Sequence, residues 1–128
     1  MFKFLKIAIF SLGFAMPTFA FAVCEQWSVT LQQNGNETGV WNFQGSDPGE
    51  MLGNGTSTDS NNGHTYTYSL DAFVEADGRV TVNRTQSSDG NNCTYTGQKT
   101  GNTITGTYVC NKGDGPWKAL VSYCLPKK

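Results

Sequence analysis

Residues 93–110, CTYTGQKTGNTITGTYVC, carry the pattern that decides the fold. Gly101-Asn102 is a dipeptide typical of the centre of a two-residue hairpin turn, and alternating runs flank it on both sides. A hairpin with this turn places Cys93 directly opposite Cys110 in a non-hydrogen-bonded pair. Cα atoms in such a pair lie roughly 4.5 Å apart, at the short end of the range for a disulfide. The turn and the cysteines together predict a disulfide-linked hairpin.

The same register gives the hairpin two different faces. Tyr95 meets Tyr108 and Gly97 meets Gly106 on the face that carries the cysteines, whereas threonines meet on the other face. Two opposed glycines leave a gap on the inner face. We expect either a large side chain such as Trp41 or a flat ligand to fill that gap, because protein interiors pack densely.

An export signal is predicted at the N-terminus. Two lysines precede the apolar run Ile7–Met16, and Ala20-Phe21-Ala22 supplies a small-x-small cleavage site. The apolar run is too short to span a bilayer. We therefore expect residues 1–22 to be a signal peptide and residues 23–128 to form a single domain that is secreted or periplasmic.

Four cysteines in an exported chain allow three disulfide connectivities. The hairpin selects Cys93–Cys110, which leaves Cys24 to pair with Cys124. The spacing contains no C-x-x-C pair and the chain has one histidine, so we expect no zinc site. Asp59–Gly63 has the oxygen-rich start of a calcium loop but lacks the bidentate glutamate, and we expect neither a metal nor a cofactor.

The charge balance excludes some classes of partner. Lys3 and Lys6 belong to the predicted signal peptide, so seven basic residues face ten acidic ones in the mature chain. A mildly acidic domain gives no support for a nucleic-acid partner or for stable association with an anionic membrane.

Short alternating runs separated by turn residues predict an all-β domain, with no helical period anywhere in the mature chain. The run at residues 50–57 is the weakest, because Gly53 and Gly55 dilute it. We expect residues 111–115 to be flexible. The predicted strands are 24–33, 38–45, 50–57, 65–74, 79–85, the two arms of the 93–110 hairpin, and 117–124.

The turn at Ala76-Asp77-Gly78 fixes the register of the next hairpin. A two-residue loop would oppose Val74 to Thr81 and mix the polar and apolar faces. A three-residue loop with its glycine in the left-handed conformation opposes Val74 to Val80 and keeps the faces separate. We therefore predict the three-residue loop, and it directs Arg84 toward the interior.

Eight antiparallel strands in meander order predict a closed up-and-down barrel. Cys24 begins the first strand and Cys124 ends the last, so a disulfide between them joins the two edges, and closure removes the exposed edges that invite aggregation. The bridge encloses nearly the whole domain, a loop worth roughly 4–5 kcal/mol in the chain-entropy model. The alternative is a two-sheet β-sandwich.

The strand number, the domain size and the triplet Gly39-x-Trp41 give the chain a topology that resembles the calycin-type barrels. These include lipocalins, avidins and small bacterial periplasmic inhibitors of lysozymes or proteases. The resemblance implies a small eight-stranded barrel and a binding or inhibitory role. It transfers no site residue to this chain.

Catalysis is not expected. His64 is the only histidine and lies in a stretch rich in Gly, Asn and Ser, where a solvated turn residue is the simplest interpretation. All four cysteines are assigned to disulfides, so no activated nucleophile is available beside a base. The carboxylates are scattered among turns and outward positions, unlike the paired acids of a glycosidase.

An inward Arg84 needs a carboxylate, carbonyls or an aromatic face. The register places it opposite Leu70 and beside Tyr68. One interpretation is an arginine that stacks on Trp27 or Trp41 and closes one end of the barrel. The other is an anchor for an anion or ligand inside a cavity.

These patterns predict an exported, non-catalytic binding protein of the bacterial envelope or medium, with a small molecule, a glycan or a secreted or host protein as its partner. The alternative is an inhibitor that plugs a secreted or host enzyme with a loop, either Gly53–Gly63 or Asn111–Pro116. Trp117 is expected at the rim, where aromatic side chains suit protein or sugar contacts. The candidate ligand-binding residues are Arg84, Tyr66, Tyr68, Tyr95, Tyr108 and Trp117.

Overall fold

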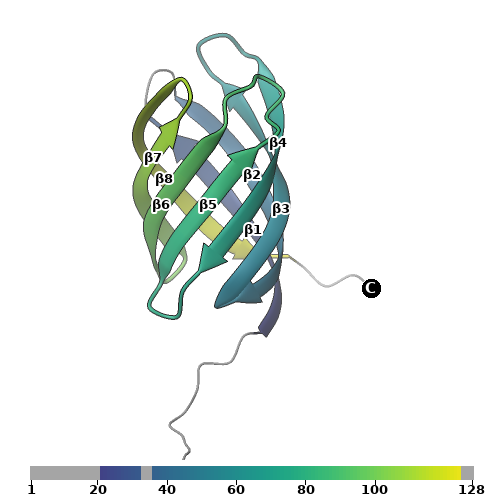
Figure 1. Cartoon of the computed structure of the whole chain (residues 1–128), viewed down its shortest axis with the longest axis vertical. Helices are drawn as coiled ribbons and strands as arrows, with labels where there is room; N and C mark the ends of the chain where they lie inside the picture. The colour runs from purple at the N-terminus through teal and green to yellow at the C-terminus, as the bar shows by residue number, and fades with distance from the viewer. Residues whose placement is uncertain (1–20, 33–35, 125–128) are drawn as a thin grey trace, which may run out of the picture.

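A computed structural model describes residues 21–32 and 36–124, which form eight antiparallel strands closed into a barrel (Figure 1). The strands are β1 (Phe21–Leu31), β2 (Glu37–Asp47), β3 (Gly49–Asp59), β4 (Thr65–Val74), β5 (Arg79–Thr85), β6 (Cys93–Thr100), β7 (Thr103–Cys110) and β8 (Gly113–Tyr123). Each strand pairs with its neighbour in the chain, and β1 pairs with β8. The all-β closed barrel is confirmed, and the alternative of a sandwich is wrong.

Both predicted disulfides are present. Cys93 lies opposite Cys110 in the β6–β7 register, with Cα atoms 4.0 Å apart. Cys24 is bonded to Cys124 with a Cα separation of 5.3 Å, so this bridge joins β1 to the residue that follows β8. Two disulfides are typical of a protein that folds in an oxidising compartment.

The β4–β5 turn has the predicted register, with Val74 opposite Val80. Gly78 adopts a φ of 94°, in the region that only glycine enters without strain. The Asp77 carboxylate accepts a hydrogen bond from the backbone N–H of Arg79 at 3.0 Å, which stabilises the turn. A polar residue and a glycine with fixed roles therefore set the register of the hairpin.

Two segments predicted as loops are largely strand. β8 begins at Gly113 rather than at Trp117, so residues 113–115 of the segment predicted to be flexible lie in a strand, and residues 111 and 112 form the turn before it. Gly115 pairs with Tyr108 in the β7–β8 register. The closed sheet supplies β7 as a partner along this whole run, which local composition does not reveal. β3 likewise extends to Asp59.

Aromatic rings fill the middle of the barrel. Trp41 lies 4.7 Å from Tyr95 and 5.6 Å from Trp117, measured between ring centroids. Trp117 pairs with Gly106, and its indole occupies the predicted gap: a Cβ on Gly97 would lie 3.2 Å from its Cζ2. Trp117 is 2% exposed, so the prediction that it lies at a rim is wrong.

The predicted signal peptide falls almost entirely outside the described residues. β1 begins at Phe21, and Phe21 and Ala22 pair with Asp47 and Ser46 of β2. Cleavage after Ala22 therefore stays a prediction. In the part of the chain that the structure describes, no helix is long and apolar enough to cross a membrane.

Candidate functional site

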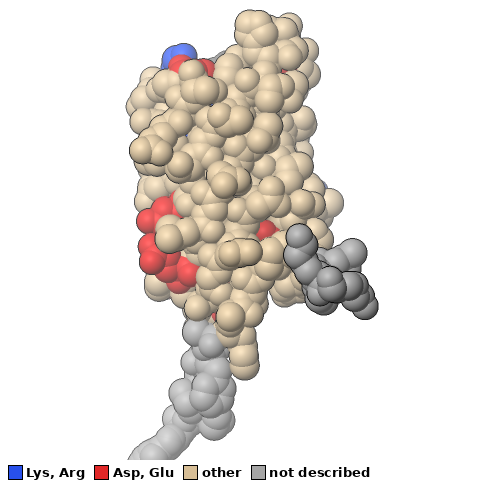
Figure 2. All heavy atoms as spheres, turned by 90° about the vertical axis from the view of Figure 1, so that its right-hand side faces the viewer, with Lys and Arg blue, Asp and Glu red and all other residues tan. Residues whose placement is uncertain are grey.

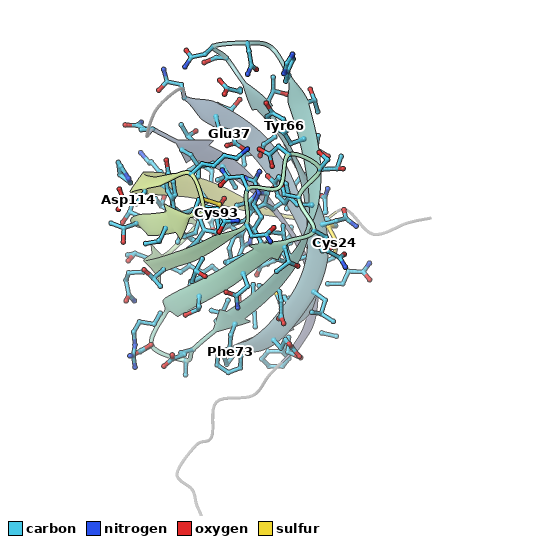
Figure 3. The ribbon with its side chains drawn as sticks, turned by 45° about the horizontal axis from the view of Figure 1, so that its top comes forward. Cys24, Glu37, Tyr66, Phe73, Cys93 and Asp114 are labelled. Carbon is cyan, nitrogen blue, oxygen red and sulfur yellow. A yellow bond between two sulfur atoms is a disulfide. The ribbon has the colours of Figure 1, made fainter. Side chains whose placement is uncertain are left out.

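A cavity of about 220 Å³ lies at the end of the barrel where β1, β3, β5 and β7 finish, here called the mouth. Most of the strands and turns at this end contribute to its wall. Figure 3, in which this end is turned toward the viewer, shows Glu37 and Tyr66 near each other at the mouth, with Phe73 at the opposite end. The lining residues are Leu31, Glu37, Asp59, Tyr66, Asp89, Asn91, Tyr108, Cys110, Lys112 and Gly113.

Arg84 is held inside the barrel by partners on three elements, and its side chain is fully buried. Its Nη1 donates to Glu37 Oε2 at 3.0 Å. Its Nη2 donates to Ser87 Oγ at 3.0 Å and lies 3.6 Å from Asp89 Oδ1. Burial alone would lower the pKa of Arg84, but Tyr95 and Glu37 hold that pKa above its ordinary value. The predicted inward orientation of Arg84 is therefore confirmed.

The aromatic partner of Arg84 differs from the prediction. Its guanidinium carbon lies 3.9 Å from the centroid of the Tyr68 ring, a cation–π contact. The Tyr68 hydroxyl accepts a hydrogen bond from Trp41 Nε1 at 2.9 Å and bonds to the Ser57 hydroxyl. The prediction that Arg84 stacks on Trp27 or Trp41 is wrong. Tyr68 lies on the adjacent strand β4, on the same face as Arg84, and its ring occupies the position next to the guanidinium.

Glu37 and Asp89 connect this buried arginine to the cavity. Their side chains are 19% and 18% exposed, and both line the cavity wall. Burial alone would raise the pKa of Asp89, but hydrogen bonds from the Ser87 hydroxyl and the Asn91 N–H outweigh burial and lower it. Both carboxylates thus have one side toward Arg84 and another toward the cavity.

A second pair of carboxylates meets at the mouth. Glu37 and Asp59 are direct cross-strand partners at the ends of β2 and β3, and both line the cavity. The Asp59 Oδ1 atom accepts a hydrogen bond from the Asn61 N–H at 2.8 Å. Asp59 forms no ion pair with any residue that the structure describes. Like charges directly opposite each other on neighbouring strands are destabilising.

Lys112 is the basic residue in the cavity wall. It lies in the β7–β8 turn, where its backbone N–H donates to Asn91 Oδ1 at 3.1 Å and its Nζ donates to the backbone carbonyl of Asp89 at 3.0 Å. These bonds tie the β7–β8 turn to the β5–β6 loop. Lys112 thus links two connections at the mouth through its backbone and its side chain.

The predicted site residues lie in three layers. Tyr66 and Tyr108 line the cavity, whereas Arg84, Tyr68 and Tyr95 are buried beneath it. Trp117 lies deeper, among the aromatic rings of the core.

Sequence reasoning missed the acidic part of the wall. Glu37 could have been found, because the inward alternation of Phe43, Trp41 and Gly39 continues to it. Asp89 and Lys112 lie in connections between strands, where no periodicity indicates their direction. Only the closed barrel brings these residues around one cavity.

The opposite end of the barrel holds a different ion network. Lys99 Nζ lies 2.6 Å from Asp47 Oδ2 and 3.4 Å from Glu25 Oε2. Glu25 is fully buried, and its Oε1 accepts a hydrogen bond from Trp27 Nε1 at 2.8 Å. Burial, with a hydrogen bond to Asp47, raises the pKa of Glu25. At this end a carboxylate is the most deeply buried charged group.

His64 lies in the exposed β3–β4 connection, with its ring 6.4 Å from that of Tyr66. Among the described residues there is no group of three or more His, Cys, Asp or Glu side chains placed to hold a metal ion. The residues that line the mouth offer hydrogen bonding, charge and aromatic contact.

The outer wall shows few charges on one broad face. Figure 2 views the side that carries β3 in Figure 1, and most of that face is uncharged, with acidic side chains gathered at its lower left and a few charged side chains of both signs at its upper left edge. The mouth is therefore a more suitable place than this face for binding that depends on charge.

Comparison with known proteins identifies the fold and no family. No protein-family model matches the chain, and no curated protein matches it either. A solved structure of a de novo designed fluorescence-activating β-barrel is similar, with a TM-score of 0.59 and 15% identity over 81% of this chain and 94% of that one. At this identity the similarity shows the closed barrel alone, and membership of a calycin family is not shown.

Proposed function

We propose that this protein is an exported, non-catalytic binding protein that holds a small polar molecule in the cavity at the mouth of its barrel. The observation that carries the proposal is the division of the interior. Aromatic side chains fill the middle, whereas the mouth keeps a cavity of about 220 Å³ lined by charged, amide and tyrosine side chains. An eight-stranded barrel is of the size that admits one small ligand.

The wall of the cavity is already held in place before any ligand binds. Arg84 fixes Glu37 and Asp89, and the bonds of Lys112 fix the β7–β8 turn against the β5–β6 loop. A wall that is ordered in advance reduces the entropy cost of binding. A few placed polar groups around a small concave space are the usual composition of a ligand site.

The proposed role as an enzyme inhibitor receives less support. Residues 53–59 of its first candidate loop lie in β3, and residues 113–116 of its second lie in β8. The β3–β4 connection still projects beyond the barrel in Figure 1, but residues 53–59 are held in the sheet by pairing with β2 and β4. We therefore retain the mouth as the functional site.

The proposal is tested by titrating the ¹⁵N-labelled protein with a library of small sugars, amines, alcohols and carboxylates. We expect a hit to shift backbone signals of residues in the cavity wall and to leave the opposite end unchanged. Tyr66→Ala should weaken that binding about tenfold or more, the effect of losing one aromatic contact and hydroxyl in a small site.

Tyr123→Ala is the matched control, because Tyr123 is 59% exposed and lies at the other end of the barrel. We expect this variant to bind the hit as the wild type does. Failure of every library compound to shift the cavity residues would reject the proposed function. So would equal losses in the two tyrosine variants.

A further inference from the structure

We propose that the ligand of the mouth cavity carries a primary ammonium group, which lies between the carboxylates of Glu37 and Asp59. This inference rests on the proposed function, since it names the chemical class that the same cavity takes. The proposal predicts that anions do not bind in this cavity and that an amine binds more tightly than a neutral polyol. Three independent features of the wall support it.

The first feature is the cross-strand pair itself. Glu37 and Asp59 are directly opposed on β2 and β3, where two negative charges repel each other. Arg84 offsets the charge of Glu37 from below and shares its own charge with Asp89. Asp59 has no ion-pair partner among the residues that the structure describes. A cation between the two carboxylates would turn this repulsion into attraction.

The second feature is a surplus of acceptors. Each of the three wall carboxylates has one oxygen engaged by the protein: Glu37 Oε2, Asp59 Oδ1 and Asp89 Oδ1. The second oxygen of each accepts no hydrogen bond from a described residue. A carboxylate can accept several hydrogen bonds, so these oxygens suit a ligand with several donors. A primary ammonium group has three donors and no acceptor.

The third feature is the composition of the rest of the wall. Three carboxylates face one ammonium group, that of Lys112, and Arg84 behind them leaves one negative charge uncompensated. Tyr66 and Tyr108 add two aromatic rings, which attract cations at their faces. An anionic ligand would meet three carboxylates in the same space. The wall therefore selects against anions and in favour of a cation with an apolar or aromatic body.

The test uses three probes of similar shape and different charge: benzylammonium, benzyl alcohol and benzoate. Each is titrated into the ¹⁵N-labelled protein at low salt and neutral pH. We expect benzylammonium to shift the signals of Glu37, Asp59 and Tyr66 and to bind about tenfold more tightly than benzyl alcohol, because an ion pair adds to the contacts that the two share. Benzoate should bind more weakly than either.

Asp59→Asn separates a ligand contact from a structural role. The variant keeps an oxygen for the Asn61 N–H and removes the charge. We expect it to bind benzylammonium about tenfold more weakly, to bind benzyl alcohol unchanged, and to melt at a slightly higher temperature without ligand because the repulsion with Glu37 is gone. Asp114→Asn is the control, since Asp114 is exposed and lies outside the cavity lining.

The outcomes separate the two proposals. Equal binding of benzylammonium and benzyl alcohol, or an Asp59→Asn variant that binds the amine as the wild type does, would overturn the ammonium inference while leaving the mouth a ligand site. Tightest binding of benzoate would do the same. Absence of mouth shifts with these probes and with the whole library would reject both proposals.

Discussion

Each end of the barrel has one cation paired with two carboxylates, but the two ends differ in which partner is buried. The pairs are Arg84 with Glu37 and Asp89 at the mouth, and Lys99 with Glu25 and Asp47 at the other end. At the mouth the cation is inside: the side chain of Arg84 is 0% exposed, and Glu37 is 19% exposed. At the other end a carboxylate is inside: Glu25 is 0% exposed, and Lys99 is 13% exposed. The carboxylates at the mouth are thus more exposed than their arginine, whereas the outer groups at the opposite end are both Lys99 and the Asp47 carboxylate, whose side chains are 13% and 17% exposed.

This difference distinguishes the end that we propose as the ligand site from the end that holds an internal ion network. A buried arginine cannot lose its proton, so its ion pairs hold Glu37 and Asp89 at the cavity wall. A buried glutamate can take up a proton, and the raised pKa of Glu25 shows that burial favours this. The buried group of the opposite ion network can thus change its charge, whereas the arginine beneath the mouth cannot.

The largest expected effects come from the disulfides. Cys24–Cys124 spans 100 residues, and Cys93–Cys110, at the mouth, spans 17. Replacing the first pair by serine should lower the free energy of unfolding by about 4–5 kcal/mol, and replacing the second by about 3 kcal/mol, because the longer loop restricts the unfolded chain more. Urea unfolding under matched conditions measures both. A larger loss for the mouth disulfide would contradict the chain-entropy explanation.

The next largest expected effect is the loss of stability when the cation at each end is replaced by an uncharged side chain. Arg84→Met leaves Glu37 and Asp89 facing each other without a counter-charge and should cost about 2–4 kcal/mol. Lys99→Met should cost about 1–2 kcal/mol, because Glu25, whose pKa is already raised by burial, can take up a proton when its counter-charge is removed. The control is Arg84→Met combined with Glu37→Gln, which should recover part of the loss. Equal costs for the two single variants would remove the proposed difference between the ends.

The same carboxylate-to-amide change should have opposite pH dependence at the two ends. The pKa of Asp89 is lowered on folding, so its stabilisation is present above its ordinary value of 3.8 and is lost as the pH falls through the lower folded value. The pKa of Glu25 is raised, so its stabilisation is present below its ordinary value of 4.5 and is lost as the pH rises through the higher folded value.

Asp89→Asn should therefore destabilise at neutral pH by about 1–3 kcal/mol, and this difference should disappear in strong acid. Glu25→Gln should become more stable relative to the wild type as the pH rises from acid to neutral, since glutamine keeps an acceptor for Trp27 Nε1. Urea unfolding across this pH range measures both trends. Parallel trends in the two variants would show that the ends do not differ in this way.

The smallest expected effect is that of His64→Ala. His64 is exposed in the β3–β4 connection and has no catalytic partner in the sequence. We expect the free energy of unfolding to change by no more than about 0.5 kcal/mol and ligand binding at the mouth to stay unchanged. A loss of binding with intact folding would extend the site to this connection and would weaken the proposal that the protein is non-catalytic.

The sequence by itself determined the features that follow from local rules. The Gly101-Asn102 turn and the two-residue period of a strand determine that Cys93 faces Cys110. The same period, with the turn that ends at Gly78, directs Arg84 inward. These features can be predicted from the turn type and from the alternation of side chains between the two faces of a strand, without knowledge of the rest of the fold.

Only the tertiary structure decided what the inward residues contact. The depth of Trp117, the contact of Arg84 with Tyr68 and the strand at Gly113–Pro116 all depend on how eight strands stagger as the barrel closes. The mouth is assembled from the ends of strands far apart in the chain, joined by connections whose direction has no period. Its chemistry is non-local, and for that reason the sequence pointed to the barrel and to Arg84 but not to the acidic cavity above it.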